Sequence, residues 1–345
     1  MVALLEPIRA KHDLPALAGA VVTSRGIAAI GSTGMRKRGS GAAVTVHDKW
    51  HLGSNTKAMT AILVAALVER GALRWERNLA EAFPELAPSM HPQMRGVNLL
   101  HLLSNRSGTA ANLRWGEIAT AVPGVREQRL RAVTQASRAA PAFAPGSSYL
   151  YSNLGFVIAG TVAEQAGKDS WEGLMRRYVF EPLRMRNCGF GGVGTSGQLD
   201  QPWGHHDNGR PLDRNGPLVD NPAAMGPAGT AHCTLTEWGN FIADQLRGAR
   251  GETTLLKPDS YRKLHTPPFG GDYALGWALA KRDWAGGIAV HHNGSNTMNF
   301  SVAWLAPAQG YAVIAVTNQG GKRAEAGLDE ASGALIGYQR KHGAR

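Results

Sequence analysis

The chain has 345 residues, a length that allows a large buried core and predicts about two domains. With 43% apolar and 18% charged residues and no periodic glycine, its composition excludes a fibrous or disordered chain. The formal net charge is +11, but the basic residues are scattered, and the densest run, Arg36–Arg38, has no interleaved aromatic residues. This pattern argues against nucleic-acid binding. No apolar stretch approaches the roughly 20 residues that a membrane span needs.

The first predicted elements are a helix and a β-hairpin. Met1–Leu14 has the pattern of a short amphipathic helix and lacks the apolar core of a signal peptide. Ala16–Thr23 and Ile27–Gly31 are small and β-branched runs on either side of Ser24-Arg25-Gly26. They predict two antiparallel strands joined by a tight turn.

The middle of the chain is predicted to be mainly helical. Ala58–Arg70 is almost continuously apolar and is followed by Gly71 as a C-terminal cap, so this helix is expected inside the protein. From about residue 75 to 230, loops rich in proline and glycine separate further helical segments at Leu99–Leu103, Arg126–Ala139, Gly155–Ala166 and Trp171–Val179.

The C-terminal part predicts strands again, and then a last helix at roughly Glu325–Lys341. The strand candidates are Tyr273–Lys281, Ile288–His292, Phe300–Leu305 and Tyr311–Thr317. Strands at both ends with helices between them predict an α+β fold, in which helices cover both faces of an antiparallel sheet. We expect residues 1–72 and 231–345 to form a discontinuous sheet domain and residues 73–230 an inserted, mainly helical subdomain. The active site is expected in the cleft between them.

Two segments match the pattern S-x-x-K, and their contexts differ. Ser260 and Lys263 lie in a polar stretch, where the serine is best explained as a solvated helix cap. Ser54 follows a glycine and directly precedes the buried helix, so its hydroxyl is expected at the first turn, where the helix dipole favours negative charge. Lys57, three residues later, shares the same helix face. A capping serine with a lysine that reaches solvent is the structural alternative.

A second candidate cluster is Tyr151-Ser152-Asn153. A tyrosine is a poor base at its usual pKa of about 10, but a neighbouring lysine is expected to stabilise the phenolate and lower that pKa. Asn153 offers an amide able to hold both Lys57 and a substrate carbonyl. The structural alternatives are a core tyrosine with a satisfied hydroxyl and an asparagine in a turn.

The third candidate is His292-Asn293-Gly294-Ser295, at the end of a predicted strand. Gly294 would let a substrate lie close to the strand edge. The backbone N–H of Ser295, together with that of Ser54, is expected to form an oxyanion hole. A polar turn is the alternative.

These three elements, in this order, resemble the superfamily of class C β-lactamases, serine DD-peptidases and family VIII carboxylesterases. The likeness extends from about residue 5 to 335. It includes the approach to the serine at Trp50–Ser54, a landmark at Leu99–Gly108 similar to HLLSHTSG, the second motif at Pro145–Gly155, and a YGLGW-like strand at Tyr273–Trp277.

The resemblance implies a β-lactamase/transpeptidase-like fold. It also implies that Ser54 attacks a carbonyl to form an acyl-enzyme, with Lys57 and Tyr151 sharing the base role and Tyr151 activating water. Two features depart from the family pattern. His292-Asn293-Gly294 stands where many class C β-lactamases have Lys-Thr-Gly, so a lysine that binds substrate carboxylates is missing. Asn105 and Arg106 replace the usual His and Thr of the landmark, which puts its local hydrogen bonding in doubt.

Other patterns favour no metal and no cofactor. Gly189–Gly194 fits G-x-G-x-x-G but is not followed by a predicted helix, so it is interpreted as a loop. His205-His206-Asp207 lacks the spacing of a third ligand and is expected in a surface loop. The two cysteines, Cys188 and Cys233, need not pair, and the chain is not expected to depend on a disulfide.

The sequence therefore predicts a serine hydrolase acting through an acyl-enzyme on small esters or amides, with short-chain carboxylesterase activity favoured. A DD-peptidase or weak β-lactamase is the alternative enzyme, and a non-catalytic penicillin- or peptide-binding module is the alternative of another class. The expected partner is a small ester, β-lactam or peptide. The sequence leaves the oligomeric state open. The family resemblance favours a periplasmic or secreted location, although the chain shows no signal peptide.

Overall fold

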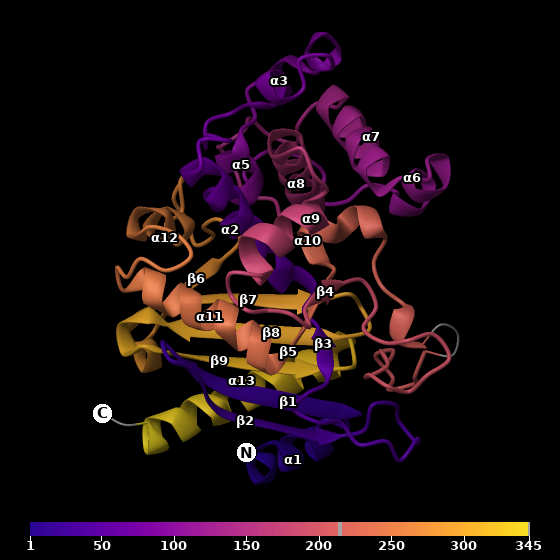
Figure 1. The fold of residues 1–345 in the computed structure, drawn as a ribbon, viewed down its shortest axis with the longest axis vertical. Helices are drawn as coiled ribbons and strands as arrows, with labels where there is room; N and C mark the ends of the chain where they lie inside the picture. Colours follow the sequence, from indigo (N-terminus) through magenta and orange to yellow (C-terminus); the bar gives the residue numbers. More distant parts are fainter. Residues whose placement is uncertain (213–215, 344–345) are drawn as a thin grey trace.

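The computed structural model describes residues 1–212 and 216–343. Its centre is a six-stranded sheet of order β2-β1-β9-β8-β7-β6, in which every neighbouring pair is antiparallel. The strands are β1 (Ala16–Thr23), β2 (Gly26–Gly34), β6 (Ala278–Arg282), β7 (Gly287–Ser295), β8 (Phe300–Ala306) and β9 (Tyr311–Thr317). The first and last parts of the chain thus share one sheet (Figure 1).

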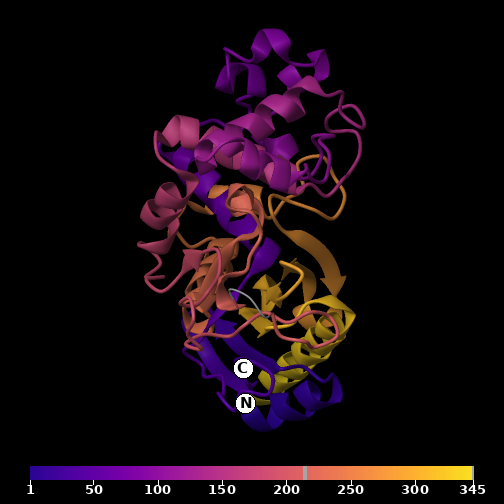
Figure 2. The same cartoon turned by 90° about the vertical axis from the view of Figure 1, so that its right-hand side faces the viewer.

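Helices cover both faces of this sheet, which confirms the predicted α+β class. On one face lie α1 (Val2–Lys11) and α13 (Gly321–His342), side by side in both views (Figures 1 and 2). On the other lies α11 (Leu235–Ala249). Successive side chains of a strand point to opposite faces, so β1 contributes Leu17 and Val21 to one core and Ala18 and Val22 to the other. Burial on both faces explains why this strand is a continuous run of apolar and small residues.

Helix α2 (Thr56–Glu69) connects the sheet to the helical region, which lies at the opposite end of the long axis (Figure 2). Every residue from Thr56 to Leu67 is buried, as expected for a helix that is apolar all round. The other helices are α3 (Leu79–Ala82), α4 (Pro92–Arg95), α5 (Leu99–Leu103), α6 (Trp115–Ala121), α7 (Val125–Arg138), α8 (Asn153–Gly167), α9 (Trp171–Met175), α10 (Gly226–Gly229) and α12 (Pro258–Leu264). The division of the chain into two domains at residues 72/73 and 230/231 stays a prediction.

Three features differ from the expectations. A small second sheet joins β3 (Lys49–His51), β5 (Ala231–Thr234) and β4 (Gly189–Phe190), and the long helix α11 follows it without having been predicted. Strand β6 starts at Ala278 rather than Tyr273, because the chain before it turns at Gly276, whose φ of +78° suits glycine.

None of the helices in the described residues has the length and apolar character needed to cross a membrane.

The expectation that the cysteines need not pair is wrong for this structure. Cys188, just before β4, and Cys233, in β5, form a disulfide with their Cα atoms 4.2 Å apart. Pairing of β4 with β5 in the small sheet brings the two residues together, although 45 positions separate them. Disulfides of this kind form and persist in oxidising compartments.

Reducing this disulfide is expected to lower the free energy of unfolding by about 2–4 kcal/mol, because the bridge restricts the unfolded chain. Denaturation in guanidinium with and without dithiothreitol measures the difference. The chain has two cysteines, so the reductant has no other disulfide to act on. Identical midpoints, together with two titratable thiols in the untreated protein, would contradict the pairing.

Candidate active site

Ser54 lies where the small sheet meets helix α2. It is the middle residue of a short 3-10 helix, Gly53–Asn55, that leads directly into α2, and its side chain is partly exposed. The Thr56 hydroxyl donates to the carbonyl of Gly53 at 2.6 Å and fixes this first turn. The nucleophile candidate therefore stands at the N-terminal end of a buried helix, where developing negative charge is favoured.

Lys57 is fully buried beside Ser54 rather than extending to solvent. Its Nζ lies 2.9 Å from Ser54 Oγ, 2.6 Å from Asn153 Oδ1 and 2.8 Å from the carbonyl oxygen of Ala228. Burial holds the pKa of Lys57 well below its usual value, since charge is costly in a low dielectric.

A neutral amine fits these three partners. It has two N–H donors, which the oxygens of Asn153 and Ala228 accept, and one lone pair, which is left for the hydroxyl hydrogen of Ser54. The arrangement gives Ser54 a proton acceptor in direct contact.

Tyr151 completes the group from the loop before helix α8. Its hydroxyl hydrogen-bonds Ser54, and Lys57 Nζ lies 4.7 Å from the centre of its ring. The expectation that Lys57 lowers the pKa of Tyr151 is wrong: burial raises this pKa, and the hydrogen bond with Ser54 offsets the rise only in part. The phenol is therefore protonated and able to donate.

Asn105, one of the two altered residues of the landmark at Leu99–Gly108, holds Tyr151 in place. Asn105 accepts the backbone N–H of Leu150 on its carbonyl at 2.9 Å and that of Ser152 on its side chain at 3.0 Å. Its φ of +58° is a conformation that asparagine tolerates better than most residues. The hydrogen bonding that the sequence put in doubt is thus present, and Asn105 binds the residues on both sides of Tyr151.

Asn153 is the first residue of α8, whose N-terminus is capped by Ser152. Its Oδ1 accepts from Lys57, and its amide nitrogen donates to Asn112 Oδ1 at 3.0 Å. Asn112 was not predicted, and nothing in the loop around it distinguishes it from other asparagines. It fixes the amide so that the oxygen faces the lysine.

His292 lies in β7 and faces the same buried side as Gly294. Its Nδ1 donates to the backbone oxygen of Asn293 at 2.6 Å, and its Nε2 accepts from the Tyr273 hydroxyl at 2.9 Å. Burial lowers the pKa of His292 to about 3. The imidazole is therefore neutral and has both nitrogens engaged, and it supplies no positive charge to a substrate.

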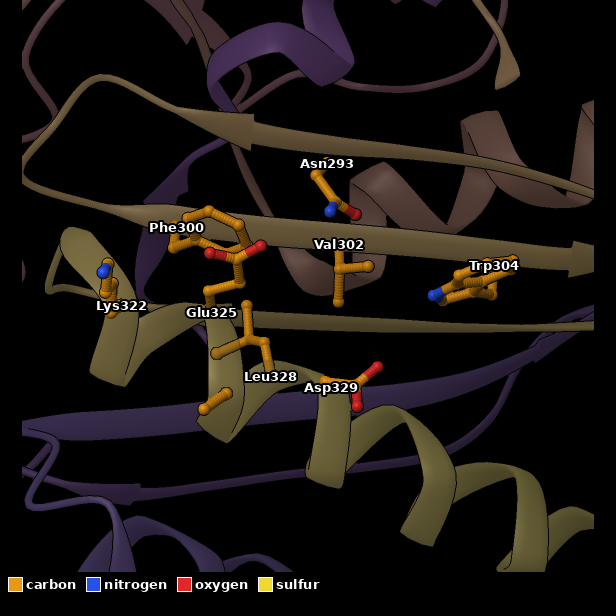
Figure 3. A pocket seen from close by; sticks show the side chains of 9 residues that line it. Asn293, Phe300, Val302, Trp304, Lys322, Glu325, Leu328 and Asp329 are labelled. Atoms are coloured by element: carbon orange, nitrogen blue, oxygen red, sulfur yellow. The ribbon is translucent and has the colours of Figure 1, made fainter. Parts of the chain in front are cut away.

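Asn293 points away from this group, because side chains alternate along a strand. It lines a separate pocket of about 440 Å³ between β7, β8 and α13, with Phe300, Val302 and Lys322 (Figure 3). That Asn293 binds substrate stays a prediction, and its side chain lies on the face of the sheet opposite His292. Its backbone oxygen, bound by His292, is its contribution to the group.

Two glycines let the nucleophile turn approach strand β7 closely. Gly53 has a φ of +49°, and a Cβ there would overlap the backbone nitrogen of Ser295. A Cβ on Gly294 would lie 2.8 Å from the backbone nitrogen of Ser54. The nitrogens of Ser54 and Ser295 are thus brought together from distant parts of the chain, as the oxyanion-hole prediction requires.

The other patterns lie outside this group. Ser260 donates to Glu69 at 2.6 Å, and Lys263 is exposed. His205 is buried rather than in a surface loop, with Nδ1 bound to the carbonyl of Asn318 at 2.7 Å and Nε2 accepting the N–H of Arg38. In the described part of the chain, no set of three or more His, Cys, Asp or Glu residues is placed to hold a metal ion.

Comparisons with known proteins show the family of this chain. The Beta-lactamase family profile matches residues 1–337. The chain is 26% identical to penicillin-binding protein 4 of Amycolatopsis lactamdurans over 91% of this chain and 84% of that protein. It is 22% identical to Protein flp of Staphylococcus aureus over 78% of this chain, and this alignment spans about half, 53%, of that longer relative.

Solved structures show the same fold. D-alanine carboxypeptidase AmpC from Burkholderia cenocepacia superposes with a TM-score of 0.76 over 98% of this chain and 97% of that one, at 17% identity. Because the family profile covers nearly the whole chain and the fold agrees, the protein belongs to the Beta-lactamase family, the serine hydrolases of the β-lactamase and penicillin-binding protein kind.

Proposed function

We propose that this protein is a carboxylesterase of the β-lactamase fold that hydrolyses small, uncharged esters through an acyl-enzyme on Ser54. The observation that carries the proposal is the fully buried Lys57 amine, 2.9 Å from the Ser54 hydroxyl, whose pKa burial holds well below its usual value. A serine hydroxyl becomes a useful nucleophile when an adjacent base accepts its proton.

In the proposed acylation, Ser54 Oγ forms a bond to the ester carbonyl carbon as its proton moves to Lys57. The backbone N–H groups of Ser54 and Ser295 stabilise the resulting oxyanion. When the tetrahedral intermediate collapses, the ester C–O bond breaks and the alkoxide takes a proton from Tyr151. Lys57 then returns its proton to the Tyr151 phenolate, so that both groups regain their starting state. Water repeats the sequence on the acyl-enzyme and releases the acid.

The preference for uncharged esters rests on the third motif. A lysine there would pair with a substrate carboxylate, whereas His292 is neutral and both its nitrogens are engaged. Esters also need less help for the leaving group than amides. The relatives named penicillin-binding protein 4 and D-alanine carboxypeptidase favour a second candidate, a DD-peptidase or weak β-lactamase.

The test compares p-nitrophenyl butyrate, nitrocefin and an acyl-D-Ala-D-Ala peptide at equal enzyme concentration, with the reactive serine mapped by fluorophosphonate labelling and mass spectrometry. The proposal expects label on Ser54 and the highest kcat/KM on the ester. Faster turnover of nitrocefin or the peptide would transfer the assignment to the second candidate. A protein that binds these compounds without turnover or label would be a binding module.

His292 also predicts how binding of charged substrates depends on pH. Because its pKa lies near 3, the imidazole stays neutral from pH 5 to 8, and the KM for nitrocefin, which carries a carboxylate, is expected to stay constant within about twofold. Steady-state kinetics across that range checks this. A KM that falls towards pH 5 would show that His292 protonates and binds the carboxylate.

A further inference from the structure

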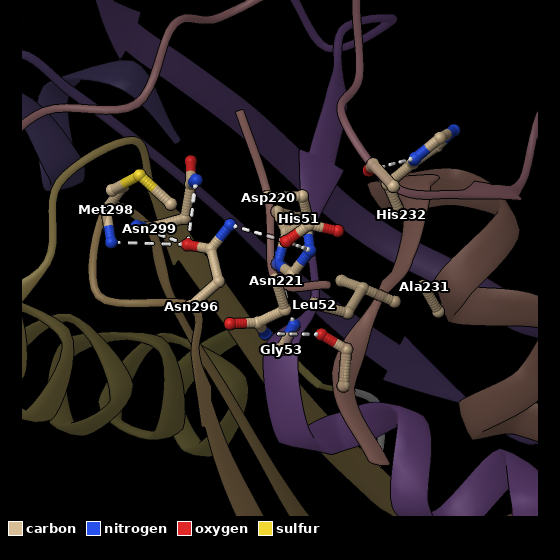
Figure 4. A network of polar contacts seen from close by, with 12 residues as sticks. His51, Leu52, Gly53, Asp220, Asn221, Ala231, His232, Asn296, Met298 and Asn299 are labelled. Atoms are coloured by element: carbon tan, nitrogen blue, oxygen red, sulfur yellow. Dashed lines mark hydrogen bonds and ion pairs between the residues drawn. The ribbon is translucent and has the colours of Figure 1, made fainter. Parts of the chain in front are cut away.

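Three buried polar side chains meet next to the two backbone segments of the site (Figure 4). His51 ends β3, Asp220 lies in the loop before α10, and Asn296 follows β7. Asp220 Oδ1 lies 2.7 Å from His51 Nε2 and accepts from Asn296 Nδ2 at 3.0 Å. The side chains of His51 and Asp220 are 2% and 5% exposed.

The tautomer of His51 follows from the hydrogen bond at its other ring nitrogen. The backbone N–H of Gly53 donates to His51 Nδ1 at 3.1 Å, so Nδ1 carries a lone pair and the ring proton is on Nε2, the nitrogen that lies 2.7 Å from Asp220 Oδ1. Asp220 thereby orients the imidazole, and the imidazole fixes the residue immediately before Ser54.

Asn296 performs the same task on the other segment. It follows Ser295 directly, and its Oδ1 accepts the backbone N–H groups of Met298 at 3.2 Å and Asn299 at 3.0 Å. These bonds shape the turn between β7 and β8. A single carboxylate oxygen is thus connected, through one side chain on each side, to both segments that supply the oxyanion-hole nitrogens.

We propose that Asp220, acting through His51 and Asn296, is a positioning residue that sets the spacing of the Ser54 and Ser295 N–H groups. The proposal rests on the function proposed above. Donors must lie within a few tenths of an ångström of where the oxyanion forms, and a displacement of about 1 Å can cost roughly 100-fold in rate. The two segments lie far apart in sequence and need such a connection.

A second set of hydrogen bonds also holds the chain around Ser54. The hydroxyl of Ser301, in β8, donates to the backbone oxygen of Leu52 at 2.7 Å and accepts from Asn55 Nδ2 at 2.8 Å. The approach to Ser54 is therefore held from the β8 side as well. Loss of Asp220 is expected to misplace the donors without dismantling the site.

Asp220→Ala is expected to lower kcat for ester hydrolysis by about 10- to 100-fold with little change in KM. The affinity for a boronic acid, which forms a tetrahedral adduct on Ser54, is expected to fall by a similar factor. Asp220→Asn keeps an oxygen acceptor and should recover part of both losses. His51→Ala combined with Asp220→Ala should cost little more than either change alone, since the two act as a unit.

Asp244→Ala is the matched control. Asp244 is also a buried carboxylate, but it binds the Tyr261 hydroxyl at 2.6 Å between α11 and α12. Its loss should lower Tm while leaving kcat and boronate affinity per labelled Ser54 unchanged. Equal losses in the two variants, or normal kcat and boronate affinity in Asp220→Ala, would overturn the positioning role.

Fluorophosphonate labelling separates this failure from that of the proposed function. If the wild type labels at Ser54 but hydrolyses no ester, the labelling rate replaces kcat, and a 10- to 100-fold slower rate in Asp220→Ala supports the positioning role. If the wild type does not label at Ser54, the proposed function is wrong and the positioning role falls with it.

Discussion

Replacing Ser54 by alanine is expected to reduce ester turnover by at least about 10⁴-fold. The residual rate is the one that substrate binding and the oxyanion donors provide without a nucleophile. The hydroxyl is partly exposed, contacts the buried amine of Lys57 and stands at the N-terminal end of helix α2. Removing it leaves Lys57 with its contacts to Asn153 and Ala228, so the fold is expected to persist. Steady-state hydrolysis of p-nitrophenyl butyrate and thermal unfolding measure both properties.

Ser260→Ala is the matched control, because Ser260 heads the other S-x-x-K match. Its hydroxyl binds Glu69 and touches none of the site residues named here. Turnover should be unchanged. If Ser260→Ala lost activity and Ser54→Ala kept it, the assignment of the nucleophile would be wrong.

Local pattern was enough to find Ser54 and Lys57. Residues three apart on a helix share a face, and the apolar sequence after Lys57 requires that helix to be buried. The structure agrees, with Lys57 fully enclosed. Tyr151 has no local signal of this kind. Its place beside Ser54 depends on how α8 packs on α2, and the family resemblance, rather than any pattern of spacing, pointed to it.

The errors have physical causes that a linear pattern does not show. The pairing of Cys188 with Cys233 depends on two short strands that pair across 45 residues. Asp220 is a single aspartate in a loop, and its contacts with His51 and Asn296 arise from tertiary packing alone.

Lys57→Met is expected to lower kcat/KM by about 10³- to 10⁴-fold, since methionine fills a similar volume but accepts no proton. The wild-type pH profile should show the same group. The active form has the neutral amine, so kcat/KM is expected to fall as the pH drops through the lowered pKa of Lys57, with no rise near 10.5, where an ordinary lysine titrates. An inflection near 10.5 that disappears in Lys57→Met would show a charged lysine in the resting enzyme.

Stability provides an independent measurement of the same shift. Between the lowered pKa and about 10.5, the unfolded chain binds a proton on Lys57 that the folded protein does not, so the free energy of unfolding rises with pH. The slope from this group approaches about 1.4 kcal/mol per pH unit in that window and vanishes above it. Urea denaturation at pH 8, 9 and 10 should show the free energy of unfolding of the wild type rising relative to that of Lys57→Met as the pH rises. Lys263→Met, which removes an exposed lysine, should run parallel to the wild type. Parallel curves for Lys57→Met as well would mean that Lys57 keeps its charge in the folded protein, and Ser54 would then lack the neutral base that acylation requires.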